Sequence, residues 1–164
     1  MNYPRGVFLA LIAVTVAGVS EADVQRMQPG QAGDFGAGAY IGSPTGLTGK
    51  YWLSDSRALD GALAWKEGDE NRFEIAVDHL WHYAFITNPS IDGRLPFYFG
   101  LGLRVLAGDD SEAGLRLPLG VSFLCKDVPV EFFAEIAPVV RFAPDTGAGI
   151  DGGVGVRYYF KPGK

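Results

Sequence analysis

The chain of 164 residues has few of the residues that form disulfides or bind metal ions in small domains: it contains one cysteine and two histidines. One thiol cannot form an internal disulfide, and no Cys/His set has zinc spacing. The chain also lacks a basic run, and its net charge of −5 argues against nucleic acid as a partner. From residue 34 onward no segment shows a convincing helical period. These absences favour a single domain built from strands, with no metal or cofactor expected.

Residues 1–22 have the composition of an export signal. MNYPR carries one positive charge, GVFLALIAVTVAGV is apolar, and Ser20 and Ala22 are the small residues that a signal peptidase reads. The apolar part is too short to cross about 30 Å of bilayer as a helix, so we expect cleavage after Ala22. Residues 23–33, DVQRMQPGQAG, are polar and contain glycine and proline, which predicts a flexible lead-in.

Residues 34–160 repeat one rhythm, in which an alternating apolar run is followed by a short turn rich in Gly, Pro, Asp, Asn and Ser. The eight runs are DFGAGAYIG, TGLTGKYWL, ALDGALAWK, RFEIAVDHLWHYA, LPFYFGLGLRVLA, AGLRLPLGVSFL, PVEFFAEIAPVVRF and GIDGGVGVRYYF. Such runs are typical of an antiparallel meander, which can close on itself and remove both sheet edges. We predict an all-β domain over residues 34–160, an eight-stranded antiparallel up-and-down transmembrane β-barrel, and a tail at residues 161–164.

Alternate residues of each run divide the predicted barrel into two faces. One face contains no Asp, Glu, Lys or Arg, whereas the other carries seven cations and seven carboxylates together with many small residues. Small side chains suit the narrow inside of a barrel, and a balanced charge suits burial in ion pairs. The predicted lumen charge network consists of Lys50, Asp60, Glu74, Asp78, Arg104, Arg116, Glu131, Glu135, Arg141, Asp151 and Arg157.

Aromatic residues of the uncharged face gather at the end of the barrel that holds both termini. The predicted aromatic girdle consists of Tyr51, Trp81, Tyr83, Phe97, Phe99, Phe123 and Phe132. Rings of aromatic residues are expected where a transmembrane barrel meets the membrane boundary, whereas a soluble core has no reason to sort them by height. A transmembrane barrel is therefore favoured over a soluble sandwich or barrel with an apolar inside.

Few residues invite a catalytic or metal-binding interpretation. His79 and His82 are three apart on a predicted strand and point to opposite faces, so His82 is expected to be a hydrogen-bonded lumen residue. Glu131 and Glu135 share the inward face beside Arg141, where ion pairing is expected rather than acid–base work. The chain is predicted not to be an enzyme.

Fourteen charged side chains should also fill the lumen and prevent porin-like flow.

Four segments resemble a family of small bacterial outer-membrane β-barrels of unknown function, with an architecture similar to the OmpA/OmpX type. They are GSPTGLTGKYWL, ALDGALAW, the stretch from LPLGVSF to CKDVPVEFFAEIAPV, and GGVGVRYYF. The resemblance covers residues 34–160 and implies insertion by the barrel-assembly machinery, with Gly155, Tyr158 and Phe160 as the assembly signal. The KPGK tail departs from the family, whose members usually stop at the aromatic residue. Pro118 and Pro138 depart from ideal strands and predict bulges or strand ends.

The first functional hypothesis is an integral protein of the bacterial outer membrane, in contact with outer-membrane lipid, monomeric, and with a structural or envelope-integrity role. A second is an outer-membrane lipid-modifying enzyme that uses His82, Asp78 or the Glu131/Glu135 pair. A third is a soluble periplasmic barrel that binds an apolar ligand inside.

Overall fold

The structure is a computed structural model that describes residues 29–43, 45–66, 72–86, 93–108 and 111–160. The predicted signal peptide, residues 23–28 and the tail at residues 161–164 lie outside the described residues. The strands are β1 (Phe35–Ser43), β2 (Thr45–Ser54), β3 (Arg57–Lys66), β4 (Arg72–Ile86), β5 (Gly93–Ala107), β6 (Glu112–Arg116), β7 (Leu119–Cys125), β8 (Val130–Ala143) and β9 (Gly147–Phe160). Nowhere in these ranges is there a helix long and apolar enough to cross a membrane.

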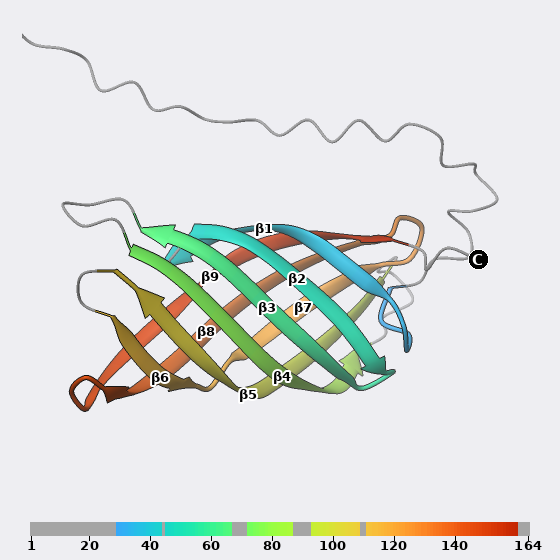
Figure 1. The fold of residues 1–164 in the computed structure, drawn as a ribbon. Helices are drawn as coiled ribbons and strands as arrows, with labels where there is room; N and C mark the ends of the chain where they lie inside the picture. The colour runs from blue at the N-terminus through green and yellow to red at the C-terminus, as the bar shows by residue number, and fades with distance from the viewer. Residues whose placement is uncertain (1–28, 44, 67–71, 87–92, 109–110, 161–164) are drawn as a thin grey trace, which may run out of the picture.

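The strands form one closed ring in which each pairs antiparallel with its neighbours. β1 pairs with β2 on one side and with the last strand, β9, on the other, so Phe35 lies opposite both Tyr51 and Phe160. The ring is completed by the pairing of β4 with β5, and Figure 1 shows the strands inclined steeply around a barrel. The predicted all-β, antiparallel, up-and-down barrel is therefore confirmed. We call the end that holds Phe35 and Phe160 the terminal end and the opposite end the far end.

The sixth predicted run is divided into two strands, so the described part of the chain contains nine strands rather than eight. β6 and β7 lie one after the other in the same gap of the ring, because each pairs with both β5 and β8. The break falls at Leu117 and Pro118, where proline has no N–H to donate to a ladder. Leu117 N donates to Pro138 O at 2.9 Å, and Gly100 N donates to Pro118 O at 2.8 Å. Pro138 itself stays inside β8, opposite Ile150.

Alternation along each strand makes this barrel polar inside and apolar outside. β2, for example, alternates exposed and buried residues over most of its length. Large apolar side chains point outward on every strand, and the exposed fraction reaches 74% at Ile150. The buried residues include Lys50, Glu131 and Arg157, which lie inside with tryptophan and tyrosine side chains. The core therefore contains buried charges together with aromatic and aliphatic side chains, and an apolar wall encloses it.

Residues 29–34, which we call the strap, fold against the terminal end. Pro29 is fully buried and its carbonyl accepts a hydrogen bond from Arg94 of β5. Asp34 Oδ2 accepts hydrogen bonds from the backbone N–H groups of Gly30 (3.0 Å) and Gln31 (2.9 Å). Gly30 and Gly33 have φ of 100° and 91°, a left-handed conformation that glycine adopts without strain. For residues 29–33 this placement differs from the flexible lead-in predicted from sequence.

Candidate functional site

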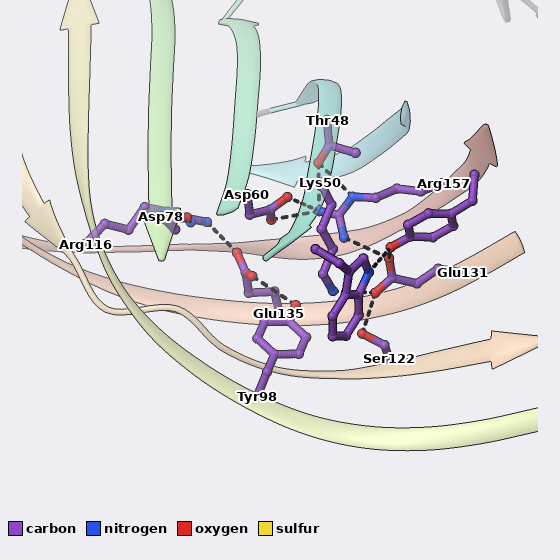
Figure 2. Close-up of polar contacts among 12 residues, drawn as sticks. Thr48, Lys50, Asp60, Asp78, Tyr98, Arg116, Ser122, Glu131, Glu135 and Arg157 are labelled. Atoms are coloured by element: carbon purple, nitrogen blue, oxygen red, sulfur yellow. Dashed lines mark hydrogen bonds and ion pairs between the residues drawn. The ribbon is translucent and has the colours of Figure 1, made fainter. Parts of the chain in front are cut away.

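A fully buried group of polar side chains in the barrel interior is centred on one carboxylate, Glu131 of β8. Lys50 Nζ of β2 lies 2.8 Å from Glu131 Oε1, and Ser122 Oγ donates to the same oxygen at 2.6 Å. Tyr159 OH donates to Oε2 at 2.6 Å, and Arg157 Nη1 lies 3.3 Å from that oxygen. Every donor reaches Glu131 from an inward-facing position, as Figure 2 shows for the labelled residues. Both carboxylate oxygens are thus satisfied, which a buried charge requires.

Arg157 of β9 extends this group across the barrel. Its Nη2 lies 2.8 Å from both carboxylate oxygens of Asp60, and its Nε and Nη2 lie 3.0 and 2.7 Å from Thr48 Oγ1. The guanidinium also lies 3.8 Å from the centre of the Phe133 ring, a cation–π contact. We call Thr48, Lys50, Asp60, Ser122, Glu131, Arg157 and Tyr159 the terminal cluster.

A middle cluster surrounds Arg116 of β6. Its guanidinium pairs with Asp78 of β4 and, at 2.5 Å, with Glu135 of β8. Tyr98 OH donates to the second oxygen of Glu135 at 2.9 Å. Arg116 Nε also lies 3.7 Å from Asp151 Oδ2, which connects this cluster to the next. Figure 2 shows Glu135 between Arg116 and Tyr98.

A far cluster surrounds Arg104 of β5. Its guanidinium lies 3.2 Å from Glu74, 3.1 Å from Asp151 and 3.6 Å from Glu112. Glu112 also pairs with Arg141 at 3.0 Å. The Arg141 side chain is 38% exposed, whereas those of Lys50 and Glu131 are fully buried. Ion pairs therefore extend along the interior, and their side chains are most deeply buried near the terminal end.

The ion pairs of the described residues include five of the seven cations predicted to face inward. The ion pairs join five cations (Lys50, Arg104, Arg116, Arg141 and Arg157) to seven carboxylates (Asp60, Glu74, Asp78, Glu112, Glu131, Glu135 and Asp151). Asp34, counted as inward in the prediction, caps the strap instead. The Lys66 and Arg72 side chains lie outside the described residues. The predicted balance of charge therefore stays a prediction.

The predicted grouping of Glu131 and Glu135 with Arg141 is wrong. Glu131 belongs to the terminal cluster and Glu135 to the middle cluster, while Arg141 pairs with Glu112 at the far end. The reason is the length of β8: residue 141 follows residue 131 by ten positions, which at about 3.3 Å per residue is more than an arginine side chain can reach back across.

His82 is placed inside the barrel but not as the hydrogen-bonded residue predicted. Its ring packs against the rings of Trp52, at 4.3 Å between centres, and Tyr98, at 5.3 Å. Neither ring nitrogen has a hydrogen-bond partner among the described residues. His79 faces the other way, with its ring 4.3 Å from that of Trp81. No group of three or more His, Cys, Asp or Glu suited to a metal ion occurs in the described ranges.

Three residues of the clusters escaped the sequence prediction: Glu112, Thr48 and Ser122. Thr48 and Ser122 have the same parity as their charged neighbours, so a search for polar as well as charged inward positions would have found them. Glu112 lies two residues before Gly114 on the inward parity of β6, but its connector GDDSE has the composition of a turn. Strand β6 begins at Glu112, earlier than the predicted run.

The predicted girdle residues form an incomplete ring of aromatic side chains around the terminal end. Tyr51, Tyr83, Phe97, Phe99 and Phe132 are exposed, and Trp81 and Phe123 are half-buried. Phe99 stacks with both Trp81 (5.5 Å) and Tyr83 (5.4 Å). On β9, Tyr158 and Phe160 continue the ring, and Phe160 stacks on Phe35 of β1 at 6.3 Å. Strand β3 has Leu59 at this height, opposite Tyr51.

This barrel is similar to one of known structure. It matches the crystal structure of the N-terminal β-barrel domain of Pseudomonas aeruginosa OprF with a TM-score of 0.59 over 79% of this chain and 98% of that one. The sequences are 13% identical, so the likeness to OprF shows the fold alone, an OmpA-like barrel. No family model matches the chain, and no curated protein matches it by sequence. The resemblance to the family of small outer-membrane barrels therefore stays a prediction.

Beyond the fold shared with OprF, the carboxylates of the enzyme hypothesis all have ion-pair partners. Asp78 and Glu135 both pair with Arg116, and Glu131 accepts from four donors. Asp78 Oδ1 has no hydrogen-bond partner among the described residues. The third hypothesis, a soluble barrel with an apolar ligand inside, needs an apolar interior. The described interior instead mixes ion-paired charges with buried side chains such as Trp52 and Leu80, and many large apolar side chains point outward.

Proposed function

We propose that this protein is an integral β-barrel of the bacterial outer membrane whose filled, ion-paired interior suits a structural or envelope-integrity role. The observation that carries the proposal is the reversed sidedness of the barrel, with charges buried inside and large apolar side chains exposed outside. Water would not stabilise such an outer wall, whereas lipid would. A closed barrel is also the one β structure that leaves no backbone edge unpaired in lipid.

The aromatic ring supports the same assignment. Aromatic side chains with a polar tip, such as Tyr51 and Tyr83, suit the boundary between headgroups and acyl chains, and both are exposed at the height of the ring. The export signal at residues 1–22, cleaved after Ala22, would deliver the chain to the envelope. The partners in this proposal are outer-membrane lipid and, during biogenesis, the barrel-assembly machinery, which would read Gly155, Tyr158 and Phe160. The mature protein is proposed to be a monomer.

A structural role is favoured over a general porin because the terminal half of the interior is full. Trp52, Lys50, Glu131, Arg157 and Tyr159 are all essentially inaccessible to solvent there. Trp52 Nε1 donates to Tyr159 OH at 3.0 Å, so even the large side chains are fixed by hydrogen bonds. In a small barrel such side chains leave no open channel.

Membrane fractionation of cells expressing the full chain tests the location. We expect the protein in the outer-membrane fraction, with gel migration that changes on heating, as a folded barrel shows. A matched control lacking residues 1–22 should stay in the cytoplasm. Recovery of the full chain from the soluble periplasmic fraction would end the proposal.

Two further measurements test the role. Conductance of the purified protein in planar bilayers should stay far below that of a porin, and a porin-sized conductance would contradict the filled interior. Mass spectrometry of lipid A and phospholipids with and without expression should give the same profile. A new lipid product that disappears on His82→Ala or Asp78→Asn would instead support the enzyme hypothesis.

A further inference from the structure

The outer wall of the barrel contains a hollow on the side formed by β1, β9, β8 and β7. It is a groove of about 510 Å³ that crosses β1, β9, β8 and β7, and its wall includes Ala39, Ile41, Val154, Ala134, Val121 and Phe132. These residues adjoin across the sheet, since Ile41 lies opposite Val154, Val154 opposite Ala134, and Ala134 opposite Val121. The volume lies within the range of small-molecule sites, roughly 300–1,000 Å³.

The groove exists because small side chains interrupt a wall of large ones. Ala39 and Ala134 point outward among Ile41, Phe132 and Val154, all of which are exposed by about half or more. On the opposite side of the barrel, the outward residues of β4 and β5 at comparable places are Ile75, Val77, Leu101 and Leu103. An alanine side chain is shorter than its large neighbours, so the outer wall is depressed at Ala39 and Ala134.

The wall of the groove has almost nothing with which to form hydrogen bonds. Its backbone groups are committed to the β1–β9, β8–β9 and β7–β8 ladders. Ser122 is the one hydroxyl-bearing residue in the lining, and it points inward and donates to Glu131. An occupant with polar groups along its length would lose hydrogen bonds to water without replacement. A hydrocarbon chain loses none.

The position of the groove indicates what kind of hydrocarbon chain would occupy it. Phe123 and Phe132, directly opposite each other on β7 and β8, line the groove and also belong to the aromatic ring. The groove therefore begins at the height of the ring and continues toward the middle of the apolar wall, where Ile41 and Val154 lie. A lipid with its headgroup at the ring would extend its acyl chain along this path.

We propose that this groove binds one acyl chain of a phospholipid in the leaflet next to the terminal end of the barrel. The inference rests on the proposed membrane location and adds to it a defined lipid site on the β7–β8–β9–β1 side.

The test compares variants that fill the groove with a matched variant outside it. Val154→Phe lies in the groove and Val77→Phe lies on the other side, and the two valines are similarly exposed, at 57% and 55%. Ala134→Phe is a second filling variant. The probe is palmitoyl-oleoyl phosphatidylethanolamine, added to each purified protein in detergent, and native mass spectrometry counts the lipid retained. Heat-modifiable migration first establishes that each variant is folded.

We expect one retained lipid on the wild type and on Val77→Phe, and retention reduced about tenfold in both filling variants, as loss of about 1.4 kcal/mol of apolar contact would produce. Equal lipid retention by all four proteins would overturn the site. A wild-type dimer that Val154→Phe converts to a monomer would also overturn it, because a second copy of the chain would then cover the groove. Retention of free palmitate but not of phospholipid would also overturn it. Fractionation tests the location separately, so a soluble protein with a lipid-retaining groove would refute the proposed function alone.

Discussion

Lys50 and Glu131 are 81 positions apart in the chain, yet Nζ and Oε1 meet at 2.8 Å with both side chains fully buried. Their strands, β2 and β8, are not neighbours in the ring, since β1 and β9 lie between them. The contact therefore crosses the inside of the barrel and can form only once β9 has closed on β1. It links the stability of the terminal cluster to closure of the barrel.

Removing Glu131 should be among the most damaging single changes. Glu131→Leu would leave Lys50 and Arg157 without one of their carboxylates in a dry interior, which is expected to cost about 3–5 kcal/mol. The matched change Arg141→Leu affects an ion pair whose arginine is 38% exposed, for which about 0–1 kcal/mol is expected. Urea unfolding in detergent micelles measures both. Equal losses would mean that the terminal cluster is as wet as the far end.

The middle cluster should behave as a coupled unit. Arg116→Met leaves Asp78 and Glu135 unpaired, whereas Glu135→Leu removes the acceptor of Tyr98 as well as one partner of Arg116. Because the two side chains touch, a double-mutant cycle is expected to give a coupling free energy of about 0.5–3 kcal/mol. Additive losses within error would show that Arg116 and Glu135 act independently.

The β1–β9 closure should not tolerate a side chain at Gly38. A Cβ there would collide with the backbone of Val156 and Arg157 across the seam, which cannot move as a side chain can. Gly38→Ala should therefore lower the unfolding midpoint and the yield of folded barrel. Gly49→Ala is the control, because its Cβ would meet atoms no nearer than 3.7 Å, and a gain of roughly 0.5–1 kcal/mol is expected there. A stable Gly38→Ala variant would contradict the close approach at this seam.

The strap should depend on the backbone conformation of its two glycines. Gly33→Ala adds no contact within 4 Å, so its cost should be the left-handed φ alone, roughly 1–2 kcal/mol. Gly30→Ala adds crowding against Leu124 and Arg94 and should cost more. Acrylamide quenching of Trp52 in a Trp65→Phe, Trp81→Phe background reports on the packing at this end. Quenching should rise in both glycine variants, and Gly33→Asn should behave more like the wild type.

Much of the inside–outside pattern could be read from the sequence. Arg157 and Val156 differ by one position, and that alone predicts that one faces in and the other out, because successive side chains of a strand point to opposite faces. The runs around Lys50 and Glu131 alternate without interruption, so their sidedness follows from parity. Pro118 was predicted to mark a bulge or a strand end, and β6 and β7 are separated there, although the predicted count of eight strands did not include this division. The prediction of a flexible lead-in did not include the hydrogen bond from Gln31 N to Asp34, which helps the strap to fold back.

The sequence did not predict which inward-facing residues contact each other. Parity places Glu135 and Arg141 on one face, but only the stagger of the strands brings Arg141 to Glu112 and Glu135 to Arg116. His82 is inward by the same rule, yet nothing in its neighbours along the chain shows that it would pack between Trp52 and Tyr98.

The sequence by itself determined the strands, the apolar outer wall and the charged inner face, because each depends on a local period of two residues. The tertiary structure alone decided which charges pair, where the strap lies and where the outer wall is hollow. Those features depend on how far each strand is shifted against the next as the sheet closes, and that shift is a property of the whole ring rather than of any single run.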